Sequence, residues 1–103
     1  MRVLQIAEWE AIDAAFWYDN RESGYGADFL HELEEAYARI SKHMRSNSKY
    51  ELYDGPYEVR RRILKRFPYL VIYTIDNVLP VVIAVAHTSR EPLYWVDRLK
   101  SLS

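Results

Sequence analysis

The 103-residue chain contains no cysteine, which excludes disulfide bonds and thiolate metal sites and is typical of a protein in a reducing compartment. Its apolar runs fall well short of the roughly 20 residues that a membrane helix needs. The first residues, Met1–Ile6, also lack the apolar stretch of a signal peptide. We therefore expect a soluble, cytoplasmic protein that does not contact a membrane.

The motifs of several common activities are missing as well. His31, His43 and His87 have no spacing typical of metal ligands, so no metal site is expected. The segment Gly24-Tyr25-Gly26 is not a dinucleotide fingerprint, because Phe29 occupies the third glycine position. No P-loop and no serine-nucleophile elbow is found. The sequence therefore predicts no cofactor.

The composition is that of a compact globule, with 50% hydrophobic and 15% aromatic residues, and its length predicts a single domain over residues 1–103. The formal net charge is only −1, but the charge is unevenly distributed. Residues 1–57 hold six Lys/Arg and eleven Asp/Glu, a charge of −5, whereas residues 58–103 hold eight and four, a charge of +4. This asymmetry indicates either an acidic partner for the second half, such as nucleic acid, or a solvated charged face.

Two helices are predicted in the first half of the chain. The short β-branched segment Arg2–Ile6 predicts a strand, and from Ala7 onward apolar residues recur at helical spacing until Ser23-Gly24. The apolar residues of this first amphipathic helix are Trp9, Ile12, Phe16 and Trp17. A second, longer helix is predicted after Gly26 and ends near Arg45. Its apolar stripe consists of Phe29, Leu30, Leu33, Tyr37, Ile40 and Met44.

The second half of the chain is predicted to be mostly β. Runs rich in Val, Ile and Tyr predict three antiparallel strands, with a hairpin turn at Asp76-Asn77. These strands are Glu58–Leu64, Tyr69–Ile75 and Val78–Ala86. The unbroken apolar run Val81–Ala86 indicates a central strand covered on both faces. Pro92 is predicted to open a short C-terminal helix, with apolar contacts from Leu93, Trp95, Val96 and Leu99.

The predicted order is therefore β-α-α-β-β-β, and the predicted fold class is α+β. It consists of an N-terminal strand, a two-helix hairpin packed on an antiparallel sheet, and a short C-terminal helix.

Arginines form the densest cluster of candidate functional residues. Arg60, Arg61 and Arg62 are consecutive on a predicted strand, so Arg60 and Arg62 should face one way and Arg61 the other. Lys65 and Arg66 follow directly. Guanidinium groups on one sheet face can bind phosphate, but they can equally form salt bridges with the acidic helices.

A second group of candidates follows the most apolar strand. His87 stands where a rigid strand passes into a loop, and its imidazole can act as a general acid or base near neutral pH. Arg90 can bind an anion beside it, and Tyr94 lies close enough in sequence to join the same site. A hydrogen-bonded structural role for His87 is equally compatible with the sequence. Tyr69 and Tyr73 share a strand face, where they either stack on bases or pack in the core.

Several of these strings resemble the RelE/ParE superfamily of toxin–antitoxin systems. The similar segments are Val59–Tyr73, Ile83–Trp95, the Phe16-Trp17-Tyr18 cluster and the connection Gly24–Phe29. The resemblance implies a two-helix hairpin on an antiparallel sheet and a toxin that a cognate antitoxin protein neutralises. RelE-like members cut messenger RNA on the ribosome without a metal ion, whereas ParE-like members block DNA gyrase. Whether the chain is an enzyme depends on which of these targets it takes.

For the mRNA endoribonuclease, the resemblance implies acid/base roles for His87 and Tyr94 and charge stabilisation by Arg60, Arg66 and Arg90. Phe67-Pro68-Tyr69 and the closing segment His87-Thr88-Ser89-Arg90 instead resemble the ParE-like branch, often named plasmid stabilisation. The net charge of −1 departs from the highly basic ribosome-dependent members, so gyrase inhibition is slightly favoured. In that case the segment 90–100 and the arginine strand would form a docking surface. A degenerate toxin that retains only antitoxin binding is the third alternative.

Overall fold

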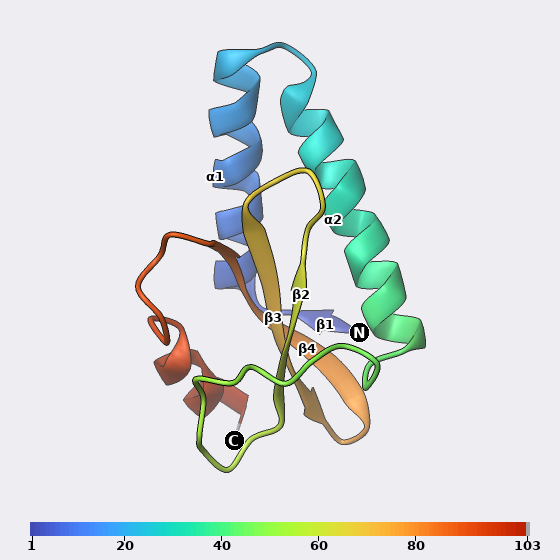
Figure 1. The fold of residues 1–103 in the computed structure, drawn as a ribbon, viewed down its shortest axis with the longest axis vertical. Coiled ribbons are helices and arrows are strands. Elements are labelled where there is room, and N and C mark those ends of the chain that lie inside the picture. Colours follow the sequence, from blue (N-terminus) through green and yellow to red (C-terminus); the bar gives the residue numbers. More distant parts are fainter. Residues whose placement is uncertain (103) are drawn as a thin grey trace.

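A computed structural model describes residues 1–102 of the chain. Its helices and strands follow the predicted order, and the fold belongs to the α+β class, as the sequence indicated (Figure 1). The elements are β1 (Arg2–Val3), α1 (Gln5–Arg21), α2 (Tyr25–Lys42), β2 (Val59–Ile63), β3 (Tyr69–Asp76), β4 (Leu79–His87) and the 3-10 helix η1 (Val96–Leu102). Helices α1 and α2 form an antiparallel hairpin that covers one face of the sheet (Figure 1).

The sheet has four strands in the order β1-β4-β3-β2. Strand β4 lies inside the sheet and Val81–Ala86 are all buried, which confirms the prediction of a central strand. The expectation of an entirely antiparallel sheet is wrong for β1, which pairs with β4 in parallel. The helical hairpin intervenes between β1 and the other strands, so β1 enters the sheet through a crossover connection and can run parallel to its neighbour.

The strand predicted over Arg2–Ile6 ends already at Val3, because α1 begins at Gln5. Leu4 serves both elements. Its backbone N–H donates to the carbonyl of Val82 at 3.0 Å, and its own carbonyl accepts the N–H of Glu8. A single residue therefore separates sheet pairing from the first turn of the helix.

Helix α1 turns its large apolar side chains away from the core, contrary to what its periodicity suggests. The residues that it buries are Ala7, Ala11, Ala14 and Tyr18. Trp9, Ile12, Phe16 and Trp17 are all exposed. Three alanines on the buried face allow α1 to approach β4 closely, which larger side chains would prevent.

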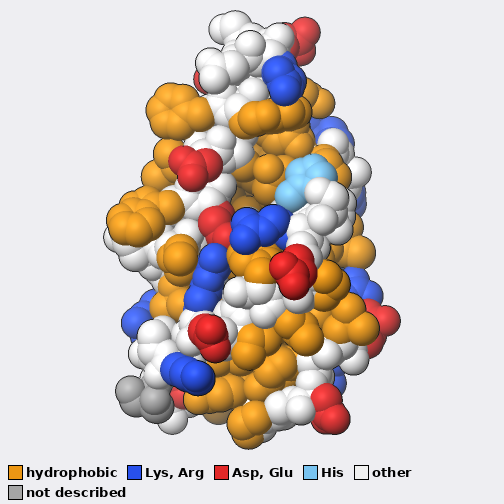
Figure 2. Space-filling view, turned by 90° about the vertical axis from the view of Figure 1, so that its left-hand side faces the viewer, with side chains coloured by type: hydrophobic (Ala, Val, Ile, Leu, Met, Phe, Trp, Pro, Cys, Tyr) orange, Lys and Arg blue, Asp and Glu red, His pale blue; other side chains and the backbone are white. Residues whose placement is uncertain are grey.

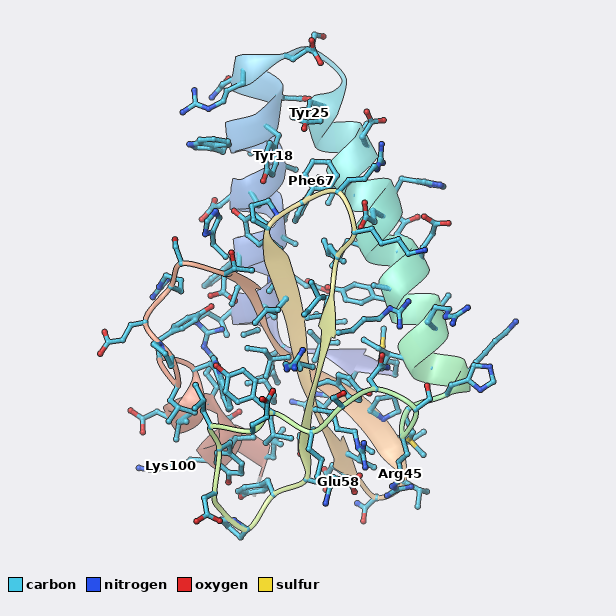
Figure 3. All side chains as sticks on the ribbon, in the orientation of Figure 1. Tyr18, Tyr25, Arg45, Glu58, Phe67 and Lys100 are labelled. Atoms are coloured by element: carbon cyan, nitrogen blue, oxygen red, sulfur yellow. The ribbon has the colours of Figure 1, made fainter. Side chains whose placement is uncertain are left out.

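Helix α2 buries Phe29, Leu33 and Ile40 as predicted, whereas Leu30 is exposed. The helix ends at Lys42, so Met44 and Arg45 lie beyond it. Its N-terminal end packs against α1 through an aromatic cluster whose members point toward one another (Figure 3). This cluster consists of Tyr18, Tyr25 and Phe67, with ring centroids 4.8 to 5.3 Å apart.

Gly26 permits the close approach of the two helices. A Cβ atom there would lie 2.4 Å from the carbonyl oxygen of Ala15. The backbone N–H of Gly26 donates to Oδ1 of Asp19 at 2.7 Å, which ties the start of α2 to α1. The Gly24–Phe29 connection is therefore a helix junction, as its sequence indicated.

Two details of the second half differ from the sequence-based prediction. The β3–β4 turn is formed by Asn77 and Val78, both with positive φ, between the paired residues Asp76 and Leu79. It therefore lies one residue later than Asp76-Asn77. The C-terminal helix begins at Val96 and not at Pro92, because Leu93 has a left-handed φ of 65° that a helix does not allow.

Candidate functional site

A cleft of about 700 Å³ lies between α1, the start of β3 and the loop that follows β4. Its walls include the aromatic side chains of Trp17, Tyr18, Tyr69 and Tyr94, and its charged groups come from α1 and from the loop after β4. The lining residues are Glu10, Asp13, Ala14, Trp17, Tyr18, Pro68, Tyr69, Val85, His87, Ser89, Arg90 and Tyr94. An apolar cleft with a few converging polar groups is the usual form of a binding site.

The cleft brings together three of the five residues that the sequence singled out, namely His87, Arg90 and Tyr94. All three lie on the segment that begins at the last residue of β4, so one strand end presents them. The sequence predicted this grouping, because residues so close together at the end of a strand have little freedom to separate.

His87 is held in one orientation by the residue two positions later. Its Nδ1 accepts the backbone N–H of Ser89 at 3.0 Å and lies 2.7 Å from the Ser89 hydroxyl. Because a backbone N–H can only donate, neutral His87 must carry its proton on Nε2. The imidazole packs edge-on against Tyr69, with ring centroids 5.2 Å apart. In this arrangement Ser89 occupies Nδ1 of His87, and Nε2 is the ring nitrogen left for a ligand.

Arg90 is the free cation of the cleft. Its guanidinium carbon lies 3.8 Å from the centre of the Tyr94 ring. Within residues 1–102 it pairs with no carboxylate, and it is exposed. Stacking on an aromatic face leaves the edge of a guanidinium available, so Arg90 can bind an incoming anion without breaking an internal ion pair.

Tyr94 belongs to a hydrogen-bonded network that joins α1 to the C-terminal segment. Its hydroxyl donates to Oε2 of Glu10 at 2.7 Å. Arg98 donates to both carboxylate oxygens of Glu10, at 2.8 and 3.0 Å. The backbone N–H of Val85 donates to Oε1 of Glu10 at 3.0 Å. Burial and the hydrogen bond to Glu10 raise the pKa of Tyr94, so its phenol remains protonated near neutral pH.

Sequence reasoning missed Glu10 and Arg98. They are 88 positions apart, and no local pattern links them. The available signal was the position of Glu10 three residues after Ala7 and four before Ala14, which places it beside the buried face of α1. That signal is useful only once the alanine face of α1 is known to be the buried one.

Arg60 and Arg66 do not line the cleft, so the structure does not bring them together with His87. Arg60 donates to Glu58 at 2.8 Å and to the carbonyl of Asn47 at 2.6 Å. Arg66 donates to Glu32 on α2 at 3.2 Å. Both side chains therefore have partners inside the protein.

The remaining arginines of β2 are paired as well. Arg61 donates to Glu51 at 2.7 Å, and Arg62 donates to Oδ1 of Asn47 at 2.9 Å. The partners of Arg60, Arg61 and Arg62 lie in the 43–58 connection and not on the acidic helices. Glu58 accepts from Arg45 and Arg60, and these hydrogen bonds lower the pKa of Glu58 (Figure 3).

The two tyrosines of β3 have different environments. Tyr69 lines the cleft, whereas Tyr73 is fully buried and donates its hydroxyl proton to the carbonyl of Met44 at 2.5 Å. Only Tyr69 is therefore placed to meet a ligand.

Two further features bear on the class of protein. Within residues 1–102, no group of three or more His, Asp or Glu side chains could hold a metal ion. None of the helices in the same residues is long and apolar enough to cross a membrane.

The helical hairpin on a four-stranded sheet agrees with the fold that the resemblance to the RelE/ParE toxins implied. A family model described as "ParE toxin of type II toxin-antitoxin system, parDE" matches residues 6–92. The chain belongs to the ParE toxin family of type II toxin–antitoxin systems. It is therefore the toxin of such a system and has a cognate antitoxin as partner. A search of curated proteins finds no match to it.

Proposed function

We propose that this toxin inhibits DNA gyrase by binding it, and that it does not cleave RNA. The observation that supports this proposal is the bonding of the two residues assigned to acid/base work, since Nδ1 of His87 accepts the Ser89 N–H and the Tyr94 hydroxyl donates to Glu10. RNA cleavage by attack of the 2′-hydroxyl requires a group that removes its proton. His87 has its Nδ1 occupied by Ser89, and Tyr94 is held as a donor to Glu10.

The distribution of cations supports the same choice. Cleavage also needs positive charge around the phosphate as negative charge develops on it. Of the three arginines assigned to that role, only Arg90 reaches the cleft, since Arg60 and Arg66 pair with Glu58 and Glu32. A formal net charge of −1 also gives little electrostatic attraction to ribosomal RNA.

A supercoiling assay tests the proposal directly. Purified toxin is added to gyrase and relaxed plasmid, and the concentration that halves supercoiling is measured. We expect the wild-type chain to inhibit, and Arg90→Ala to need about ten-fold more protein, because it removes a free cation from the cleft. Arg39→Ala is the matched control, since this exposed arginine lies on α2, outside the cleft. Intact supercoiling at saturating toxin would contradict the proposal.

The second candidate function is ribosome-dependent RNA cleavage, which the shared cleft of His87, Arg90 and Tyr94 favours. Programmed ribosomes are incubated with the toxin, and the message is examined for cuts. Message cleavage that His87→Ala abolishes would replace gyrase inhibition with this alternative. A chain that binds its antitoxin but affects neither gyrase nor message would be a degenerate toxin.

A further inference from the structure

Arg90 is exposed and lies in the loop between β4 and η1, where it pairs with no carboxylate within residues 1–102. An exposed arginine in a loop ordinarily adopts many side-chain conformations, and ordering one of them on binding costs free energy. Here the guanidinium carbon of Arg90 lies 3.8 Å from the centre of the Tyr94 ring. The position of this cation therefore depends on what holds Tyr94.

Tyr94 is held from the side of α1. Its hydroxyl donates to Oε2 of Glu10 at 2.7 Å, so the ring cannot turn away from α1 without losing that hydrogen bond. The next residue, Trp95, is buried, and its ring centre lies 5.3 Å from that of Tyr50. On the side of the molecule formed by α1 and the loop after β4, basic and acidic side chains lie next to one another among hydrophobic ones (Figure 2). Two consecutive residues of the loop are thus fixed by different parts of the chain.

Glu10 is in turn fixed to the central strand. Arg98 donates to both of its carboxylate oxygens, at 2.8 and 3.0 Å, and also to the carbonyl of Ile83 at 3.1 Å. The backbone N–H of Val85 donates to Oε1 of Glu10. The side chains of Glu10 and Arg98 are only 17% and 15% exposed, so water competes little for these hydrogen bonds. The acceptor of the Tyr94 hydroxyl is therefore a rigid point of the fold.

We propose that Glu10 is a positioning residue for Arg90 and acts through Tyr94. Glu10 fixes the Tyr94 ring, and the ring holds the guanidinium of Arg90 at the cleft, so that an anionic group of the partner meets a cation already in place. Such preorganisation raises affinity because less ordering is left to be done on binding. The inference rests on the proposed function, since gyrase is the partner whose binding is measured.

A purely structural role for Glu10 makes a different prediction. In that case, losing its hydrogen bond to Tyr94 lowers the free energy of unfolding and leaves inhibition per folded molecule unchanged. If Glu10 positions Arg90, the loss weakens inhibition, but only while Arg90 is present. A double-mutant cycle distinguishes these two roles, because residues that act as a unit are not additive.

The test measures the toxin concentration that halves supercoiling for wild type, Tyr94→Phe, Arg90→Ala and the double variant. Glu10→Ala is expected to cost much stability, whereas Tyr94→Phe keeps the ring and removes only the hydrogen bond to Glu10. We expect Tyr94→Phe to raise that concentration about five-fold, the effect of one hydrogen bond. Where Arg90 is already alanine, the same change should have less than about a 1.5-fold effect.

Tyr73→Phe is the matched control. The Tyr73 hydroxyl also donates inside the protein, to the carbonyl of Met44, but Tyr73 does not line the cleft. Its loss should lower stability and leave inhibition per folded molecule within about 1.5-fold of wild type, with or without Arg90. Circular dichroism melts give the folded fraction of each variant.

A second readout reports on Arg90 without gyrase. Protons held against the face of an aromatic ring resonate upfield of their ordinary position. In NMR spectra of wild-type toxin, the side-chain protons of Arg90 should therefore lie upfield of those of the exposed Arg39. Tyr94→Phe should move them at least half of the way back, because the ring is no longer fixed, and Tyr73→Phe should leave them in place.

Three results would overturn the proposal. The first is inhibition by Tyr94→Phe within about 1.5-fold of wild type. The second is an equal loss from Tyr94→Phe with and without Arg90, which would mean that the hydroxyl acts independently of Arg90. The third is the absence of an upfield shift for Arg90 in the wild-type toxin. If wild-type toxin fails to inhibit gyrase, the proposed function is contradicted, whereas upfield Arg90 protons that Tyr94→Phe shifts back would still support the role of Glu10.

Discussion

The arginine strand β2 and the cleft at the end of β4 both contain arginine, and they differ in what the guanidinium groups face. On β2, each arginine has an internal partner, such as Glu58 for Arg60 and Glu51 for Arg61. In the cleft, Arg90 has only an aromatic ring beneath it. A dense run of arginines thus stabilises the fold, whereas a single unpaired one is available for a ligand. The density of cations in a sequence does not identify a binding site.

The largest effect is expected within the cleft, from Glu10→Ala. The substitution leaves Arg98 with an uncompensated charge and the N–H of Val85 without its acceptor. Removing one partner of a largely buried pair costs about 3 kcal/mol of unfolding free energy. Urea unfolding followed by circular dichroism measures it. Glu22→Ala, at the exposed end of α1, is the control and should change stability by less than about 0.5 kcal/mol. If Glu10→Ala lowers the free energy of unfolding no more than the control does, the hydrogen bonds of Glu10 do not stabilise the fold.

Replacing one arginine from β2 and one from the cleft with alanine separates a role in stability from a role in inhibition. Arg60→Ala should lower stability by about 1.5 kcal/mol, because its hydrogen bonds to Glu58 and to the Asn47 carbonyl are lost, while gyrase inhibition per folded molecule stays unchanged. Arg90→Ala should do the reverse, with stability within about 0.5 kcal/mol of wild type and weaker inhibition. Urea unfolding and the supercoiling assay separate the two effects. Equal loss of inhibition in both variants would remove the distinction between the regions.

The sequence predicted well those parts of the fold in which the hydrophobic pattern by itself determines which residues are buried. Strand β4 is an example, since the apolar side chains of Val81–Ala86 are removed from water only if the strand lies inside the sheet. Helix α1 was oriented wrongly for a physical reason. Close packing on β4 selects Ala7, Ala11 and Ala14, although Trp9 and Phe16 are far more hydrophobic. The periodicity of a single sequence reports which residues are hydrophobic, but not how much space lies between a helix and the sheet that it packs against.

The candidate site was predictable to a similar extent. His87, Arg90 and Tyr94 are close in sequence, so their grouping follows from one strand end. Arg60 and Arg66 lie outside the cleft, and their carboxylate partners Glu58 and Glu32 become apparent only in three dimensions. Long-range pairs are decided by tertiary packing and leave no local pattern.

A smaller effect with a defined pH dependence is expected at Glu32, which is the partner of Arg66. Burial alone would raise its pKa, but hydrogen bonds from the backbone N–H groups of Lys65 and Arg66 hold the pKa of Glu32 below its ordinary value of 4.5. A lowered pKa in the folded state stabilises the protein above pH 4.5, and that stabilisation is lost as the pH falls through the folded-state pKa.

Glu32→Gln should therefore lower stability by about 1 kcal/mol at pH 7, and the difference from wild type should shrink below pH 4.5. Unfolding free energies at pH 7 and near pH 3.5 provide the comparison. Glu35→Gln, at an exposed neighbouring position, is the control. Its difference in unfolding free energy from wild type is not expected to shrink between pH 7 and pH 3.5. A difference that widens in acid would show that the charge of Glu32 is not what stabilises the connection between β2 and β3.

The smallest effect is expected at the rim of β2, where Arg61 pairs with Glu51. The carboxylate is 73% exposed, so water and salt screen its attraction to Arg61. Glu51→Gln should change the unfolding free energy by no more than about 0.5 kcal/mol, and the change should vanish in high salt. Urea unfolding at two salt concentrations measures it, and the supercoiling assay shows whether freeing Arg61 creates activity. Stronger gyrase inhibition by Glu51→Gln would mean that unpairing an arginine is enough to make it functional. Unchanged inhibition would mean that the cleft around Arg90 contributes more than a free charge, through the aromatic walls and the fixed Nε2–H of His87.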